Sequence, residues 1–208
     1  MGLPLWDPRK LLELPAVYNF FQEAVGANKG RRHFIQEFVV PLAGGRVLEV
    51  GCGPGTNCEW FPENVEYVGC DLDEKYIAYA KQRYGSRAEF YATPVGQLGK
   101  SGLKPFNAVM ALAVLHHLSD NEVLTLCDEV AGLLKPGGLF VTGDPCFTAD
   151  QSRPERFMTS CDRGRFVRFP EQYHALLKKR FPQVRSDIRR GRLLHIPNTG
   201  VIMTAIKE

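Results

Sequence analysis

A glycine-rich segment directly after a short apolar run constrains the fold of this chain more than any other feature. Residues 46–50 read RVLEV, and the next five residues, GCGPG, place glycines at positions 51, 53 and 55. A short apolar run bounded by glycines is typical of a buried strand. Glycines at its end allow the backbone to approach a ligand, because no Cβ intervenes. In open α/β sheets ligands bind at the carboxyl ends of the strands, so this segment predicts a ligand site.

Strands and helices alternate along much of the remaining chain. Apolar runs predict strands at 65–70, 88–91, 106–113, 139–142, 184–188 and 200–206. Periodic segments predict helices at 7–26 (broken near Pro15), 31–40, 75–84, 120–134 and 171–179. The last two strands follow each other without a helix, so one of them is expected to be antiparallel. The alternation predicts an α/β fold with a mostly parallel sheet covered by helices on both faces.

The spacing of the polar residues around the glycine loop narrows the choice of possible ligands. Asp71, sixteen residues after Gly55, ends the second predicted strand and can accept hydrogen bonds from both hydroxyls of a ribose. A dinucleotide and S-adenosylmethionine are both compatible with a glycine loop followed by an aspartate at this position. The dinucleotide fingerprint GxGxxG has Thr56 at its last glycine position here. Glu49 would repel a pyrophosphate and attract the cationic methionine end of S-adenosylmethionine, which disfavours a nicotinamide oxidoreductase.

Four segments in order, VLEVGCGPG, YVGCDLDEKYIAYAKQRYG, FNAVMALAVLHHL and LLKPGGLFVT, span Arg46 to Thr142. This stretch resembles the class I S-adenosylmethionine-dependent methyltransferases. The resemblance implies a Rossmann-like, seven-stranded sheet, mostly parallel, with one antiparallel strand and helices on both faces. It also implies S-adenosylmethionine as the cofactor.

The resemblance assigns cofactor contacts to individual residues. Glu49 is expected to face the amino-acid end, Asp71 the ribose and Leu72 the adenine. The acidic residue usual after the third strand is replaced by Pro94, which leaves adenine recognition to backbone groups or to Gln97. The expected cofactor contacts are Glu49, Gly51, Cys52, Gly53, Gly55, Asp71, Leu72, Pro94, Val95, Gln97 and Ala111.

Three residues near the ends of the fourth and fifth predicted strands are candidate catalytic residues. His116 and His117 can act as a general base, because histidine titrates near neutrality, or can simply form the strand-to-helix connection. Asp144 can orient or deprotonate an acceptor, or form a turn before Pro145. Methyl transfer from a sulfonium needs no strong base where the acceptor is held in line with the methyl group.

The C-terminal quarter of the chain is basic. Residues 151–195 hold twelve Lys and Arg against four Asp and Glu, a net charge of +8, while the remainder carries −5. Arg163 and Arg165 suit a carboxylate or phosphate on the acceptor, although a solvated basic loop has the same composition. Tyr18 is expected to contribute to the acceptor site from the N-terminal helix.

The chain is therefore expected to form one methyltransferase domain over residues 1–208. Its expected parts are an N-terminal helical lid (1–42), a cofactor-binding core (46–142), an acceptor-side loop (143–170) and a terminal helix with strands (171–208). The expected function is methyl transfer from S-adenosylmethionine to a small anionic metabolite. The alternatives are an RNA methyltransferase, which lacks support from any aromatic-and-basic recognition motif, and a non-catalytic S-adenosylmethionine-binding module.

Composition excludes several other classes of protein. No apolar run approaches the roughly 20 residues that span a bilayer, and the first residues lack a continuous apolar stretch. The six cysteines show no CxxC spacing, so we expect structural thiols and no metal site. The sequence thus predicts a cytoplasmic enzyme with a small-molecule acceptor and without a membrane or nucleic-acid partner.

Overall fold

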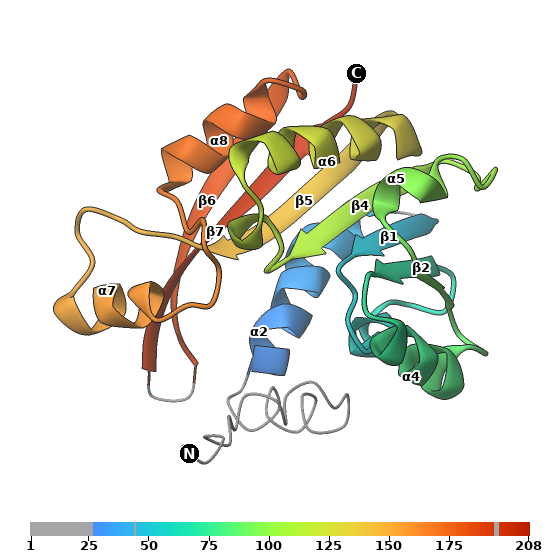
Figure 1. The fold of residues 1–208 in the computed structure, drawn as a ribbon, viewed down its shortest axis with the longest axis horizontal. Coiled ribbons are helices and arrows are strands. Elements are labelled where there is room, and N and C mark those ends of the chain that lie inside the picture. The colour runs from blue at the N-terminus through green and yellow to red at the C-terminus, as the bar shows by residue number, and fades with distance from the viewer. Residues whose placement is uncertain (1–26, 44, 194–195) are drawn as a thin grey trace, which may run out of the picture.

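The computed structural model describes residues 27–43, 45–193 and 196–208 (Figure 1). The helix predicted at 7–26, with Tyr18, lies outside the described residues. Seven strands form one sheet in the order β3-β2-β1-β4-β5-β7-β6. Their bounds are β1 Arg46–Val50, β2 Glu66–Asp71, β3 Glu89–Ala92, β4 Phe106–Leu112, β5 Leu134–Pro145, β6 Gln183–Leu193 and β7 Ile196–Ile206.

The strand directions confirm the predicted sheet. Strands β1 to β5 pair in parallel, whereas β7 lies between β5 and β6 and is antiparallel to both. The central strands are buried on both faces, since Leu48 and Val109 belong to one apolar cluster while Val47 and Met110 belong to the other. Burial on both faces explains why these strands read as continuous apolar runs.

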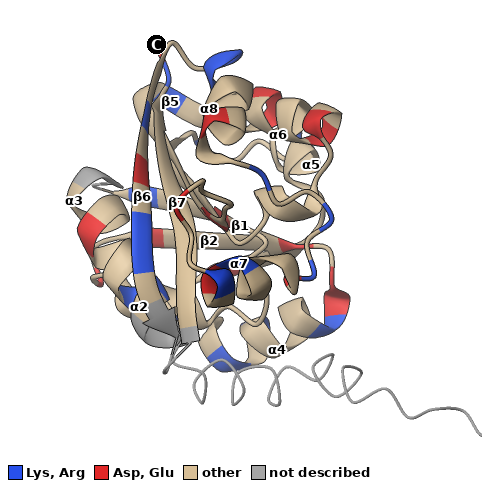
Figure 2. Cartoon of the chain, turned by 90° about the vertical axis from the view of Figure 1, so that its left-hand side faces the viewer, with Lys and Arg blue, Asp and Glu red and all other residues tan. Residues whose placement is uncertain are grey.

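Helices cover both faces of the sheet (Figures 1 and 2). One face packs against α5 Val95–Leu98, α6 Asp120–Leu133 and α8 Pro170–Lys178. The other face packs against α2 Ala27–Phe34, its π-helical continuation Ile35–Val39, α3 Val40–Ala43 and α4 Glu74–Tyr84. Two short 3-10 turns, Thr56–Trp60 and Leu115–His117, follow β1 and β4. A further helix, α7 Arg153–Ser160, packs beside β7.

Side-chain caps fix where the two long surface helices begin. Asp73 accepts hydrogen bonds from the backbone N–H groups of Lys75 and Tyr76 at the start of α4. Ser119 and Glu122 form a reciprocal capping box at the start of α6.

The C-terminal hairpin and α7 depart from the prediction. Strands β6 and β7 pair over their whole length, from Gln183↔Ile206 to Leu193↔Ile196, and thus extend well beyond the predicted apolar runs. Much of β6 is exposed and basic (Figure 2), so those residues carry no apolar pattern to predict a strand. The expected acceptor-side loop contains α7, which begins with a capping box of Ser152 and Glu155.

Among the described residues, no helix is long and apolar enough to cross a bilayer. The described part of the chain likewise holds no group of three or more His, Cys, Asp or Glu side chains arranged to bind a metal ion. All six cysteines are unpaired, and five of them are buried, the exception being Cys161.

Candidate functional site

The loop after β1 turns back on itself through three left-handed glycines. Gly51, Gly53 and Gly55 have φ values of 69°, 53° and 77°, a region that side chains with a Cβ rarely adopt. The N–H groups of Gly51 and Cys52 both donate to the carbonyl of Cys70, at 2.8 and 3.0 Å. The loop is thereby fixed against the carboxyl end of β2.

The glycines of this loop serve different purposes. A Cβ on Gly55 would lie 2.6 Å from the ring of Phe90 and 2.9 Å from Ala80, so Gly55 permits close packing beneath the loop. A Cβ on Gly53 would meet nothing within 4 Å. Gly53 therefore presents bare backbone to open space, as a ligand-binding loop requires.

Asp71 joins this loop to the end of β2. Its Oδ2 accepts a hydrogen bond of 2.8 Å from the N–H of Gly53, and its Oδ1 accepts one of 2.9 Å from the N–H of Asp73. A carboxylate has about four lone-pair positions, so Asp71 retains acceptor capacity for hydroxyl groups of a ligand. The structure thus places Asp71 at the end of β2, in contact with the glycine loop.

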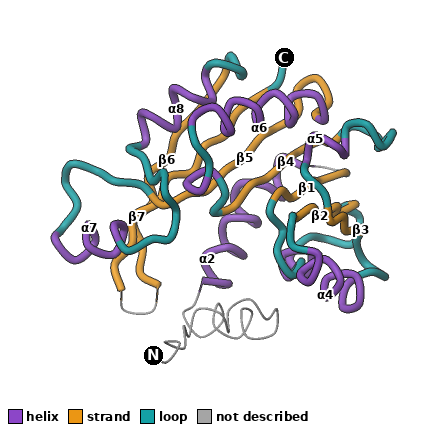
Figure 3. The backbone as a smooth tube through the Cα atoms, viewed as in Figure 1, coloured by secondary structure: helices purple, strands orange, loops and turns teal. Residues whose placement is uncertain are grey.

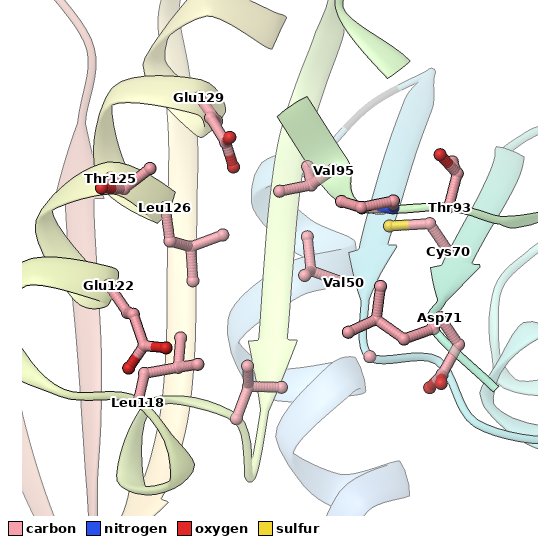
Figure 4. A pocket seen from close by; sticks show the side chains of 14 residues that line it. Val50, Cys70, Asp71, Thr93, Val95, Leu118, Glu122, Thr125, Leu126 and Glu129 are labelled. Carbon is pink, nitrogen blue, oxygen red and sulfur yellow. The ribbon is translucent and has the colours of Figure 1, made fainter. Parts of the chain in front are cut away.

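Two adjoining cavities lie at the carboxyl ends of β1, β2 and β4, and Gly51 and Asp71 line both. The larger cavity, of about 390 Å³, is mostly apolar and lies between these strands and α6 (Figure 4). It is lined by Val50, Gly51, Cys70, Asp71, Leu72, Thr93, Pro94, Val95, Val114, Leu118, Glu122, Thr125, Leu126 and Glu129. The smaller cavity, of about 150 Å³, is mostly polar and is lined by Arg31, Glu49, Gly51, Cys52, Gly53, Pro54, Thr56, Asn57, Asp71, Tyr76, Leu112 and Ala113.

Glu49 is the buried acid of the smaller cavity. Its side chain is 1% exposed and accepts hydrogen bonds from Asn57 Nδ2, at 2.6 Å, and from the hydroxyl of Tyr67. Burial raises the pKa of Glu49 to about 7, although these hydrogen bonds and the charge of Arg31 act in the opposite direction. The carboxyl group is thus poised to ionise when a cation enters the cavity.

The structure brings most of the predicted cofactor contacts together. Glu49, the loop residues Gly51, Cys52 and Gly53, and Asp71, Leu72, Pro94 and Val95 all line one or both cavities. Gln97 lines neither, because its side chain accepts a hydrogen bond from Thr93 Oγ1. Ala111 is fully buried in the sheet, and Leu112 and Ala113 line the cavity instead.

Several lining residues escaped the sequence analysis. Asn57 and Tyr76 reach the smaller cavity from two separate elements, and no local pattern marks them. In the larger cavity Glu122 and Glu129 come from α6. Their spacing of seven residues places them on one helix face, which is a signal that the sequence did contain.

His116 is buried between two carboxylates. Its Nδ1 lies 2.8 Å from Asp144 Oδ1, and its Nε2 lies 3.2 Å from Asp162 Oδ1. Burial alone would lower the pKa of His116, but hydrogen bonds and charges from Asp144 and Asp162 raise it to about 9. With both ring nitrogens occupied, His116 is suited to hold the loop at Asp162 onto β5 rather than to accept a proton.

His117 has a contrasting environment on the same 3-10 turn. Its side chain is exposed, and its ring centroid lies 4.1 Å from that of His116. Burial of part of the ring and the positive charge of His116 lower the pKa of His117. Two neighbouring histidines are therefore driven to opposite protonation states, His116 charged and His117 neutral at pH 7.

The loop that follows α7 is fastened to the core by Arg168. This side chain is 6% exposed, pairs with Asp120 at 2.8 Å, and donates to the carbonyls of Leu115, Leu118 and Phe166. Figure 3 shows the loops on either side of α7 running out from the sheet and back. Arg163 and Arg165 are exposed on this fastened loop, whereas Arg168 is committed to its internal contacts.

Comparison with known proteins places this architecture among methyltransferases. The profile of a family described as "Methyltransferase domain" matches residues 47–138. The ubiquinone biosynthesis O-methyltransferase of Bordetella avium is 33% identical over 138 residues, which cover 64% of this chain and 52% of that protein. The chain thus spans about half the length of the curated relatives it matches.

Solved structures agree with the fold at low sequence identity. An S-adenosylmethionine-dependent methyltransferase from Archaeoglobus fulgidus superposes with a TM-score of 0.71 at 18% identity, covering 91% of this chain and 99% of that chain. The N-methyltransferase NodS of Bradyrhizobium japonicum, solved with S-adenosylhomocysteine, superposes with a TM-score of 0.65 at 20% identity and covers 86% of each chain.

A matched pair of alanine variants can distinguish the structural roles of Gly53 and Gly55. Gly55→Ala is expected to lower the free energy of unfolding by about 2–4 kcal/mol, because a left-handed alanine is strained and its Cβ overlaps Phe90 and Ala80. Gly53→Ala, at a similar φ but in open space, should cost only about 1–2 kcal/mol. Chemical denaturation measures both, and equal losses would contradict the assignment of packing to Gly55.

Proposed function

We propose that this chain, which belongs to the class I S-adenosylmethionine-dependent methyltransferases, binds S-adenosylmethionine across the two joined cavities and methylates a small anionic molecule. The observation that carries the proposal is the pairing of an apolar cavity with a polar one around Gly51 and Asp71. A nucleoside with a charged amino-acid end needs both environments. The open backbone at Gly53 fits a ligand that passes directly over the loop.

The larger cavity suits the nucleoside. Leu72 is 74% exposed at its rim, which leaves an apolar side chain available to pack on a base. Asp71, oriented by the N–H groups of Gly53 and Asp73, is placed to accept hydrogen bonds from the ribose hydroxyls. Val95 and Val114 complete apolar walls against which a flat base can stack.

The smaller cavity suits the amino-acid end. Glu49 offers a carboxylate to an ammonium group, and Arg31 lines the same space with a cation that matches a carboxylate. When bound, the cofactor supplies a methyl group on a cationic sulfur. The role of Glu49 is to bind and orient the charged end, with its own proton released as it does so.

The acceptor is proposed to approach from the side of His117 and the loop after α7. His117 is the candidate general base, because its lowered pKa keeps the imidazole neutral. Arg163 and Arg165, exposed on the loop that Arg168 fastens, are proposed to bind an anionic group of the acceptor. His116 and Asp144 act through His117 and the loop, as positioning residues.

A small-molecule acceptor agrees with what the relatives are named for. The curated relatives carry names for O-methylation in ubiquinone biosynthesis. Basic residues on α7 and β6 (Figure 2) give the acceptor side an overall positive charge. These observations support the anionic character of the acceptor proposed here.

Calorimetric titration tests the cofactor directly. S-adenosylhomocysteine is expected to bind at one site per chain, and NADH is expected not to bind, since Glu49 would repel a pyrophosphate. Asp71→Ala should weaken the binding of S-adenosylhomocysteine by about 1–3 kcal/mol, the value of a hydrogen bond to a charged group. Binding of NADH alone would refute the proposed function.

The affinity for S-adenosylhomocysteine should depend on pH through Glu49. Because the pKa of Glu49 lies at about 7, the carboxyl group is mostly protonated at pH 6 and mostly charged at pH 8. Affinity is therefore expected to rise about tenfold between these pH values as the ammonium group gains its partner. In Glu49→Gln the dependence should disappear, and a slope that persists in this variant would assign it to another group.

The proposed acceptor residues predict a separation of kinetic effects. His117→Ala should lower kcat by about 10²- to 10⁴-fold if the acceptor must lose a proton, and should leave acceptor KM nearly unchanged. The double variant Arg163→Ala/Arg165→Ala should instead raise the acceptor KM. Cofactor affinity serves as the control in both cases, and a fall in that affinity would show that the substitutions disturb the nucleoside site.

A further inference from the structure

We propose that Glu129 of α6 selects the base of the bound nucleoside, by accepting a hydrogen bond from the 6-amino group of adenine. This inference rests on the proposed function, since it concerns the nucleoside half of the cofactor. It assigns base recognition to a helix on the far side of the cavity from β3.

The side of the cavity next to β3 offers no acidic side chain. The described residues that line the cavity there are Thr93, Pro94 and Val95. Pro94 lacks an N–H, and the hydroxyl of Thr93 donates to Gln97, which holds that amide outside the cavity. A base in this cavity must find its polar side-chain partner elsewhere.

The opposite wall, formed by α6, provides two carboxylates. Glu122 and Glu129 both extend from α6 toward the space between α6 and the strands (Figure 4). Glu122 is already engaged, because its Oε2 accepts hydrogen bonds of 2.7 and 2.6 Å from the N–H and hydroxyl of Ser119. Glu129 forms no hydrogen bond or ion pair with any described residue, so its carboxylate is available.

The position of Glu129 depends on a glycine in α5. A Cβ on Gly96 would lie 2.1 Å from Glu129 Oε1 and 2.6 Å from its Cδ, so the carboxylate rests where a side chain would otherwise be. The charge of Glu129 also reaches Cys70 at the end of β2, where it is one of the smaller causes that raise the pKa of that thiol. Glu129 and Cys70 thus border the same cavity from opposite walls.

A half-buried carboxylate discriminates between purines by its hydrogen-bonding capacity. A carboxylate only accepts hydrogen bonds, so it matches a 6-amino group and repels the 6-oxo group of hypoxanthine. Replacing Glu129 by Gln keeps the shape and adds an amide donor, which can face either base. The substitution is thus expected to erase selectivity rather than binding.

The test compares S-adenosylhomocysteine with S-inosylhomocysteine by calorimetry, which requires no turnover. The wild-type protein is expected to prefer the adenine compound by about 10- to 100-fold, the effect of one hydrogen bond to a charged group. In Glu129→Gln this ratio should fall by at least about tenfold. Gly96→Ala, whose Cβ displaces the carboxylate without removing its charge, should also reduce the ratio.

Two matched variants show whether the effect belongs to Glu129. Glu63→Gln removes an exposed acid remote from the cavity lining and should leave the ratio unchanged. If the ratio falls in Glu122→Gln but not in Glu129→Gln, recognition belongs to the capping residue and the inference is overturned. Failure of both compounds to bind the wild-type protein would refute the proposed function itself, whereas tight binding with unaltered preference in Glu129→Gln would refute only the inference.

Discussion

The left-handed backbone at Gly51, Gly53 and Gly55 is the constraint on which the rest of the site depends. It turns the chain back so that two consecutive N–H groups share the carbonyl of Cys70. The same turn brings the N–H of Gly53 to Asp71, which fixes the carboxylate between the two cavities. Without this turn the polar and apolar cavities would not share a boundary, and no extended ligand could use both.

Two buried ionisable side chains, Glu49 and His116, respond to burial in opposite ways. Burial of Glu49 outweighs its hydrogen bonds and the charge of Arg31, so its pKa moves toward neutrality and the carboxyl group stays responsive to a ligand. His116 is desolvated but held between Asp144 and Asp162, so it remains charged and acts as a fixed structural link. Under the proposed function, the responsive acid Glu49 serves cofactor binding, whereas the fixed cation His116 serves positioning on the acceptor side.

The sequence predicted the sheet and the glycine loop because both depend on local or nearly local signals. Strands buried on both faces read as apolar runs, and the loop glycines stand where positive φ is required. The β6–β7 hairpin extends beyond the core with exposed residues such as Ile188 and Arg189, so its length had no apolar signature. Helix α7 depends on its capping box, Ser152 with Glu155, and not on an apolar face, since Phe157 is 66% exposed.

The cavity walls were less predictable because they depend on how elements pack. Ala111 and Leu112 differ by one residue on β4, yet the alternation of the strand buries the first and directs the second to the cavity. Packing likewise decides which residues of α6 are buried. Val123, Cys127 and Val130 are fully buried and define the stripe of this helix that faces the core. Residues at the margin of that stripe are half-buried only because α5 and the strand ends lie beside it. A carboxylate at such a margin is close enough to the apolar cavity to act on a ligand, and the seven-residue spacing of Glu122 and Glu129 marks the helix face they share but not the cavity that this face lines.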